Sequence, residues 1–224
     1  MKPRIGVTTG YKNGVQQVDH HYIRAVEVGG GIPLIVPMVE DASTAQEFAT
    51  LLDGLIMIGG PAITKGLIGA LPPDLGETDP IRIHADELIF AALSDRPVLG
   101  ICYGMQFINA QAGGTIYADV LAQRPNTLLH SADRGSPGHT VTFAEGSRLA
   151  VLLGRRELAV NSHHIQAVRD LGTGLHAVGF SPDGIIEGLE SEDGRLLGVQ
   201  FHPERMLAET LPLFEGFIQN CRKG

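Results

Sequence analysis

Short apolar runs alternate with longer amphipathic stretches through the first half of the chain. This alternation is typical of parallel strands joined by crossover helices, because strands buried on both faces read as continuous apolar runs. Capping residues mark the starts of several predicted helices, as in the Asp79-Pro80 pair that opens one of them. The pattern predicts strands over 4–8, 32–36, 55–58 and 98–101, and helices over 19–28, 41–52, 79–93 and 103–112.

The second half changes to closely spaced short strands separated by turn residues, with one amphipathic helix at the end. No repeat, low-complexity tract or linker divides the sequence. We therefore expect one α/β domain over 1–224, with a doubly wound, mostly parallel central sheet flanked by helices and a small antiparallel β extension. The strands expected in this half are 140–143, 158–160, 175–180, 185–190 and 196–200, followed by a helix over 209–221.

Composition narrows the classes of function. The 224 residues are 43% hydrophobic with a formal net charge of −8, and they lack the basic stripe that nucleic-acid binding needs. No apolar run approaches the ~20 residues of a membrane span, and a strand predicted from residue 4 leaves no room for a signal peptide. Cys102 and Cys221 do not suggest a disulfide framework. We expect a cytoplasmic protein without nucleic-acid or membrane partners, and the sequence leaves a homo-oligomer open.

Cys102 stands in a Gly-x-Cys-x-Gly turn between an apolar strand and a helix, which is the form of a nucleophile elbow. Gly100 and Gly104 allow the sharp turn, since a side chain at either position would collide with neighbouring backbone. The thiol then lies at the start of a helix, whose partial positive charge favours a thiolate. A buried cysteine is more often a small core residue, and we assign that role to Cys221.

His202 and Glu204 supply the partners that a thiolate nucleophile requires. His202 would carry the proton to the departing nitrogen, and Glu204 would orient the ring and stabilise its protonated form. The backbone amides of Gly60 and Tyr103 are the expected oxyanion hole. All these groups follow the carboxyl ends of predicted strands, where sites in such sheets lie. The set predicts amide hydrolysis through Cys102.

Three segments together resemble the class I glutamine amidotransferase-like superfamily: 100–106, the Gly-Gly-Pro at 59–61, and the His-Pro-Glu at 202–204. Segments 160–168 and 181–187 are similar to its γ-glutamyl-γ-aminobutyrate hydrolase branch. The resemblance implies a flavodoxin-like fold, a Cys-His-Glu triad, and cleavage of γ-glutamyl amides through a γ-glutamyl thioester, without a metal or cofactor.

The resemblance also implies a small-molecule γ-glutamyl substrate, bound at its α-amino and α-carboxylate end. An amide, a hydroxyl and imidazoles offer the donors and acceptors that this zwitterionic end needs. The substrate-binding residues expected are Gly59, Gln106, Ser162, His163 and His164.

The chain departs from the branch at the entrance to the pocket. The branch has an arginine after the cysteine, where this chain has Tyr103, and an arginine–aspartate pair where this chain has Ile83 and His84. It also has an aspartate shortly after Gly-Gly, which 61–65 lacks. The leaving amine is therefore left undefined, and we expect loop 61–78 to shape specificity.

Three functions follow from these features. The first is a stand-alone hydrolase of γ-glutamylated amines, favoured by 161–168 and 183–187. The alternative is a glutaminase subunit that delivers ammonia to a synthetase partner, favoured by Tyr103. A binding or regulatory protein without turnover is the third, and the complete Cys-His-Glu set argues against it.

Adjacent histidines occur at 20–21 and at 163–164. Their side chains diverge on a helix or strand, and no third ligand stands at a useful spacing from either pair. We therefore predict no metal site.

Overall fold

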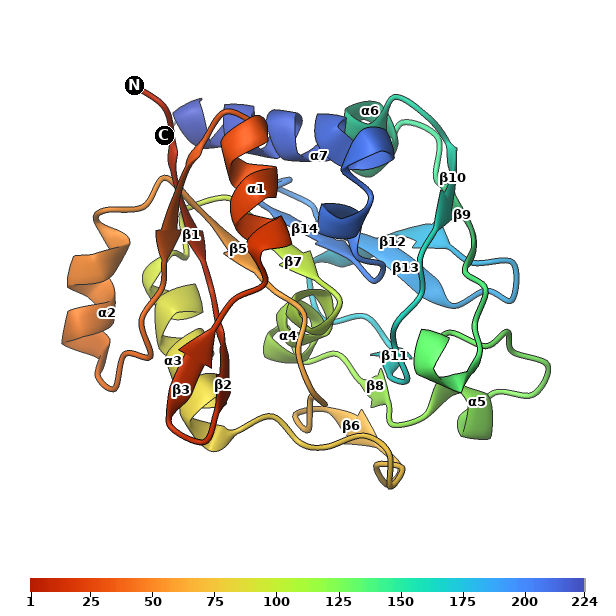
Figure 1. Cartoon of the computed structure of the whole chain (residues 1–224). Helices are drawn as coiled ribbons and strands as arrows, with labels where there is room; N and C mark the ends of the chain where they lie inside the picture. The colour runs from red at the N-terminus through yellow and green to blue at the C-terminus, as the bar shows by residue number, and fades with distance from the viewer. Residues whose placement is uncertain (224) are drawn as a thin grey trace.

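A nine-stranded sheet runs through the protein and carries helices on both faces (Figure 1). The computed structural model describes residues 1–223. Five neighbouring strands are parallel, in the order β4 (Ile32–Ile35), β1 (Arg4–Val7), β5 (Gly54–Met57), β7 (Val98–Ile101) and β14 (Leu196–Val199). Four antiparallel strands continue the sheet: β13 (Ile186–Ser191), β12 (Leu175–Phe180), β9 (His139–Phe143) and β10 (Glu157–Val160). The predicted α/β fold with a mostly parallel central sheet is confirmed.

The three strands β5, β7 and β14 bury every one of their residues, as expected for parallel strands covered on both faces. Their register aligns their ends: Gly100 pairs with Met57 on one side, and Ile101 pairs with Val199 on the other. The loops that leave the carboxyl ends of these strands therefore meet at one edge of the sheet. Those loops carry Gly59, Cys102 and His202.

Helices α1 (His20–Val28), α6 (Arg148–Leu153) and α7 (Leu207–Asn220) pack on one face of the sheet, along the top in Figure 1. Helices α2 (Ala42–Ala49), α3 (Pro80–Ala92) and α4 (Tyr103–Gln111) pack on the other. The helix starts follow the local sequence. The side chain of Asp41 caps α2 by accepting from the Thr44 amide, and Asp79 caps α3 with Pro80 in its first turn.

Several short elements were not expected from the sequence. Loop 61–78 contains β6 (Leu67–Ile68), which joins β8 (Ile116–Tyr117) and β11 (Ala167–Val168) in a second, three-stranded sheet. Two-residue strands carry no periodic pattern, since they form only where distant segments meet.

The remaining short elements that the sequence did not predict are β2 (Gly10–Lys12), β3 (Val15–Gln17), α5 (Val120–Gln123), α6, η1 (Ala132–Arg134), η2 (Pro203–Arg205) and η3 (Cys221–Lys223).

No helix within residues 1–223 has both the length and the apolar character needed to cross a membrane.

Candidate active site

Cys102 lies at a sharp bend between β7 and α4, with a backbone φ of 53° and ψ of −103°. Few residues other than glycine adopt a positive φ, because it costs free energy. The neighbouring glycines allow the bend. A side chain on Gly104 would collide with the carbonyl of Met57 in β5, and one on Gly100 would collide with the Gly104 backbone. The Cys102 side chain is thereby held at the start of α4, and the residue is 7% exposed.

Two backbone amides in the loops at this edge of the sheet are free within the described residues. Tyr103 is the first residue of α4, so its N–H has no partner within the helix. The amide of Gly60, in the loop after β5, likewise forms no hydrogen bond within the described residues. The Gly59 amide is occupied, since it donates to the Tyr22 hydroxyl at 3.1 Å. The geometry thus leaves the two predicted oxyanion donors, Gly60 and Tyr103, free to bind an anion.

His202 and Glu204 lie in the turn that follows β14. The Nδ1 atom of His202 is 2.7 Å from Oε1 of Glu204, whose side chain is fully buried. Pro203 opens the short helix η2, and its carbonyl accepts from the Thr210 hydroxyl at 2.7 Å. This turn keeps the imidazole and the carboxylate on the same side of the backbone.

The Cys102 side chain is near enough to His202 to affect the pKa of its ring. Burial by itself lowers the pKa of His202, but the Cys102 and Glu204 side chains outweigh it and raise this pKa to about 10. His202 is therefore protonated at neutral pH.

Asn161 holds the backbone of His202. Its Oδ1 accepts from the His202 amide at 2.9 Å, and its Nδ2 donates to the His202 carbonyl at 2.9 Å. The sequence gives Asn161 only as part of a motif, without a role. The structure shows that its side chain joins the loop after β10 to the turn after β14.

Tyr22 was not anticipated from the sequence. This residue of α1 is buried, and its hydroxyl lies 3.4 Å from Nδ1 of His202 while it accepts from Gly59. The His202 ring also packs against Gly59, where a Cβ atom would be 2.7 Å from Cε1. Tyr22 shares its face of α1 with the buried Ala25 and Val26, so the sequence pattern predicts only a core position.

Arg82 is a second unanticipated residue. It is 1% exposed, and its Nη2 donates to the carbonyls of Ile58 and Gly59 at 3.3 and 3.1 Å. Its guanidinium carbon lies 4.1 Å from the centre of the Tyr103 ring. In a trans peptide the carbonyl and the next N–H point in opposite directions. By holding the Gly59 carbonyl, Arg82 turns the Gly60 amide away from itself.

Arg82 is also paired with Asp86, one helical turn later, at 3.3 Å. Burial raises the pKa of Asp86 to about 6, against the opposing effect of Arg82. The family positions of the arginine–aspartate pair hold Ile83 and His84 here, but the same helix carries this buried pair instead. The sequence signal was the i,i+4 spacing of Arg82 and Asp86.

A cleft of about 420 Å³ opens beside these groups. His202, Gly60 and Arg82 line it together with Tyr22, and Arg205 lies at its rim, paired with Asp19 at 2.9 Å. A larger hollow of about 720 Å³ lies elsewhere, between the N-terminal residues and Cys221.

The predicted substrate-binding residues divide into two groups. Gly59 lines the cleft, and the exposed His163 has its ring centre 5.9 Å from that of His202. Burial, together with His202 and Arg205, lowers the pKa of His163.

The other three are buried. Gln106 Nε2 donates to the Gln166 carbonyl at 3.0 Å and to Oε1 of Gln200 at 3.1 Å, and the Ser162 hydroxyl donates to the His130 carbonyl at 2.6 Å. Both ring nitrogens of His164 have partners inside the protein. Their contact with substrate stays a prediction.

Cys221 lies far from this site along the sheet, in the turn after α7. Its thiol donates to the Phe217 carbonyl at 3.3 Å, and burial, followed by the nearby Asp53, raises its pKa to about 12. Both cysteines are free. Cys221 stays a neutral thiol at physiological pH, which fits the packing role predicted for it.

Comparisons with known proteins agree with the fold and give the family. The family model described as Peptidase C26 matches residues 3–204. The chain is 34% identical over 218 residues to protein NtpR of Enterococcus hirae, covering 92% of this chain and 90% of that one. It is 30% identical over 225 residues to the gamma-glutamyl-gamma-aminobutyrate hydrolase PuuD of Escherichia coli, covering 94% and 88%. The crystal structure of a putative GMP synthase subunit from Thermoplasma acidophilum superposes with a TM-score of 0.68 at 20% identity, covering 99% and 95%.

Proposed function

Because this chain belongs to the Peptidase C26 family, within the class I glutamine amidotransferase-like proteins, we propose that it hydrolyses the γ-glutamyl amide bond of a small γ-glutamylated amine through a thioester on Cys102. One observation carries the proposal. Nδ1 of His202 is 2.7 Å from Oε1 of Glu204, and Cys102 is near enough to the same ring to raise its pKa. These contacts support a nucleophile, a proton carrier and an orienting acid in Cys102, His202 and Glu204.

In the first half-reaction, the resting pair is a Cys102 thiolate and a protonated His202. The sulfur attacks the γ-carbonyl carbon and forms a C–S bond, and the carbonyl electrons move to the oxygen. The amides of Gly60 and Tyr103 bind this oxyanion. Collapse breaks the C–N bond, and His202 gives its proton to the departing amine.

In the second half-reaction, water attacks the thioester carbon while neutral His202 accepts a proton from it. Collapse of this second oxyanion breaks the C–S bond and releases glutamate. The proton taken by His202 restores the starting pair with the Cys102 thiolate. Glu204 keeps its hydrogen bond to Nδ1 throughout, so that Nε2 faces the reacting atoms.

The name of one relative supports the class of reaction. Gamma-glutamyl-gamma-aminobutyrate hydrolase is the name of the PuuD relative, which supports a γ-glutamylated amine as substrate. The alternative, a glutaminase subunit serving a synthetase, rests on Tyr103. The Tyr103 ring is buried with Arg82 stacked over it, which argues against a role in selecting the leaving group by contact. The stand-alone hydrolase is therefore the favoured function.

The test uses the purified chain alone, with glutamine and a panel of γ-glutamylated amines as substrates. We expect release of glutamate and free amine from the panel, with slow turnover of glutamine. Cys102→Ala should lower the turnover rate by several orders of magnitude, and Cys221→Ala should keep the wild-type rate. Glutaminase activity that rises sharply on adding a cell extract would instead support the synthetase subunit. Full activity of Cys102→Ala would overturn both functions.

A further inference from the structure

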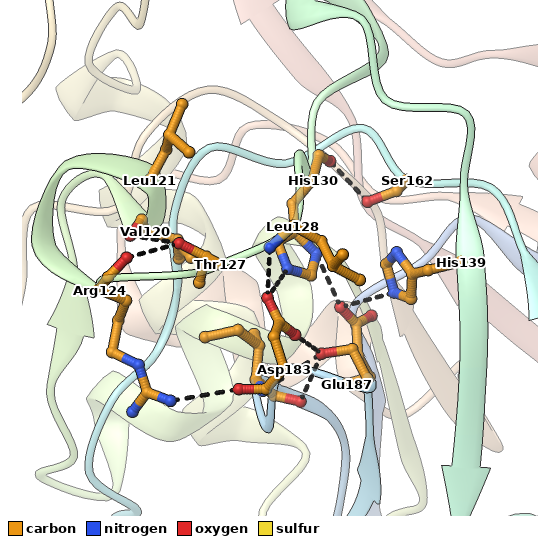
Figure 2. A network of polar contacts seen from close by, with 12 residues as sticks. Val120, Leu121, Arg124, Thr127, Leu128, His130, His139, Ser162, Asp183 and Glu187 are labelled. Carbon is orange, nitrogen blue, oxygen red and sulfur yellow. Dashed lines mark hydrogen bonds and ion pairs between the residues drawn. The ribbon is translucent and has the colours of Figure 1, made fainter.

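A second cluster of titratable side chains lies behind the candidate active site. It consists of His130 before η1, His139 at the start of β9, His164 between β10 and β11, and Glu187 on β13. Each of these side chains is at most 3% exposed. Figure 2 shows His130 and His139 on opposite sides of the Glu187 carboxylate. Four separate segments thus bring three imidazoles to one buried carboxylate.

The imidazole nitrogens converge on a single oxygen. Oε1 of Glu187 lies 3.4 Å from Nδ1 of His130, 3.1 Å from Nε2 of His139 and 3.2 Å from Nε2 of His164. The other Glu187 oxygen, Oε2, has no hydrogen bond within the described residues. Neither ring nitrogen of His139 has one, because its Nε2 approaches Glu187 without hydrogen-bond geometry. Buried polar atoms without partners are costly, so these require an explanation.

The protons on two of the rings are fixed from outside the cluster. Nε2 of His130 lies 2.9 Å from Oδ2 of Asp183, an oxygen that also accepts from the Leu128 amide. Nδ1 of His164 lies 2.8 Å from the Gln166 carbonyl. A carbonyl and a carboxylate offer only lone pairs, so each of these nitrogens donates its N–H.

A neutral imidazole carries only one proton. In the neutral rings, the nitrogens of His130 and His164 that face Glu187 therefore present lone pairs to a carboxylate oxygen. Lone pairs on these nitrogens and on the carboxylate oxygen repel one another, and in a buried site a positive charge between them relieves this repulsion. Metal-binding histidines commonly donate their second N–H to a carboxylate or a backbone carbonyl, and His130 and His164 do so to Asp183 and Gln166.

We propose that this cluster binds one divalent cation of the zinc type, with His130 Nδ1, His139 Nε2, His164 Nε2 and Glu187 as its ligands. Three imidazoles and one carboxylate are a donor set that suits zinc. Two buried negative charges, on Glu187 and Asp183, balance the charge of the ion. The cluster includes one of the adjacent histidines weighed in the sequence, His164, and its other members come from separate segments that sequence spacing does not connect.

The distances allow this ion after a small rearrangement. Ligands about 2.0–2.1 Å from a tetrahedral metal are about 3.3–3.4 Å from one another. The three distances to Glu187 Oε1 are close to that edge, and the ligand atoms of His130, His139 and Glu187 all lie within 4.8 Å of one another. Any adjustment on binding would fall most easily on His139. It makes no hydrogen bond that would hold it back.

The bound cation would stabilise the segments that lie behind the candidate active site. The Gln166 carbonyl that accepts from His164 also accepts from Gln106 on the elbow helix, and the Glu187 carbonyl accepts from the Gln200 amide. A bound ion would fix these segments together without contacting the substrate. Its effect is expected on stability more than on the chemical step.

The experiment uses the full chain without a histidine tag, in a Cys102→Ala background that removes the thiol of the active site as a competing ligand. After treatment with a chelator, zinc is added, excess metal is removed, and bound zinc is measured by mass spectrometry. His139→Asn tests the site, because this residue makes no hydrogen bond that the fold needs. His176→Asn is the matched control on an exposed histidine of β12.

We expect about one zinc per chain, a higher melting temperature with zinc, and an affinity at least ~100-fold lower in His139→Asn but unchanged in His176→Asn. Cobalt(II) in place of zinc should give the visible absorption of a tetrahedral site, absent in His139→Asn. Folding of each variant is checked by circular dichroism. No zinc uptake, or equal uptake by His139→Asn and the control, would overturn the proposal.

Discussion

The side chain of Asn161 forms two hydrogen bonds with the main chain of His202. It accepts from the His202 amide and donates to the His202 carbonyl, each at 2.9 Å. An asparagine side chain can make this pair of bonds because its amide carries both a donor and an acceptor. The imidazole therefore stands on a turn held from two sides, by Asn161 and by the Thr210 bond to Pro203. Its position is set before substrate arrives, which is what proton transfer requires.

Replacing Asn161 should thus impair catalysis without touching substrate. We predict that Asn161→Ala lowers kcat by about 10–100-fold, because a shift of about 1 Å in a catalytic group costs that much. Asn161→Asp keeps the acceptor for the His202 amide and should lose less. The measurement is steady-state kinetics with a γ-glutamylated amine. A kcat within twofold of wild type for Asn161→Ala would show that the turn holds its position without this contact.

Replacing Glu204 should lower kcat less than replacing the nucleophile Cys102, but more than replacing a buried acid outside the site. Glu204→Gln keeps the shape of the side chain and removes the charge that stabilises protonated His202, so we expect kcat to fall on the order of 10²-fold. Cys102→Ala should lose far more. Equal losses in the two variants would contradict a purely orienting and charge-stabilising role for Glu204.

The raised pKa of His202 predicts a pH dependence of stability. The pKa is about 10 in the folded protein and about 6.5 in an unfolded chain. Protonation therefore favours the folded state fully below pH 6.5, and this contribution is lost as the pH rises toward 10. Between about pH 8.5 and 10, where a cysteine in the unfolded chain is also ionised, urea unfolding should show a falling free energy of unfolding, with a smaller slope in His202→Gln. The same slope in both proteins would mean that His202 is not the group responsible.

Arg82 should act on the reaction through the Gly59–Gly60 peptide. Arg82→Lys keeps the positive charge beside Asp86 but loses the planar donor that holds the carbonyls of Ile58 and Gly59. We predict a fall in kcat of roughly 10-fold with little change in KM, because the Gly60 amide would no longer be fixed. Arg24→Lys, on the exposed side of α1, serves as the control. Matching kinetics for the two variants would exclude this role.

The parts of the fold that the sequence predicts well are those with fully apolar runs. Strand 98–101 is observed with the predicted bounds because every residue in it is buried. Helix α6 and strands β6, β8 and β11 were missed for a different reason. They are short, and pairs such as Leu67 with Ile116 exist only because tertiary contacts bring them together.

The residues of the candidate site also fall into those that the sequence predicts and those that it does not. Cys102 and the His202–Glu204 pair are visible in the sequence because glycines or a proline next to them fix their local geometry. The roles of Tyr22, Arg82 and His139 depend on which distant segments they meet, which no local pattern records. Gln106 shows the limit most clearly, since its place one turn into α4 allows either the cleft or the interior. Its amide turns inward to Gln166 and Gln200.

The two cysteines should differ sharply in reactivity. At neutral pH a mild alkylating agent should modify Cys102, the proposed nucleophile, and leave Cys221, whose pKa burial raises to about 12. Peptide mapping by mass spectrometry measures both sites in one sample. Modification of Cys221 at the rate of Cys102 in the folded protein would contradict the assignment of the nucleophile.

Direct observation of the acyl-enzyme tests the central claim. The wild-type chain is mixed with a γ-glutamylated amine, quenched in acid within the first turnovers, and mapped by mass spectrometry. We predict a γ-glutamyl group attached to the peptide that contains Cys102, sensitive to hydroxylamine as a thioester is, and absent from Cys102→Ser. Turnover without any adduct on Cys102, or with the adduct on another residue, would contradict the account.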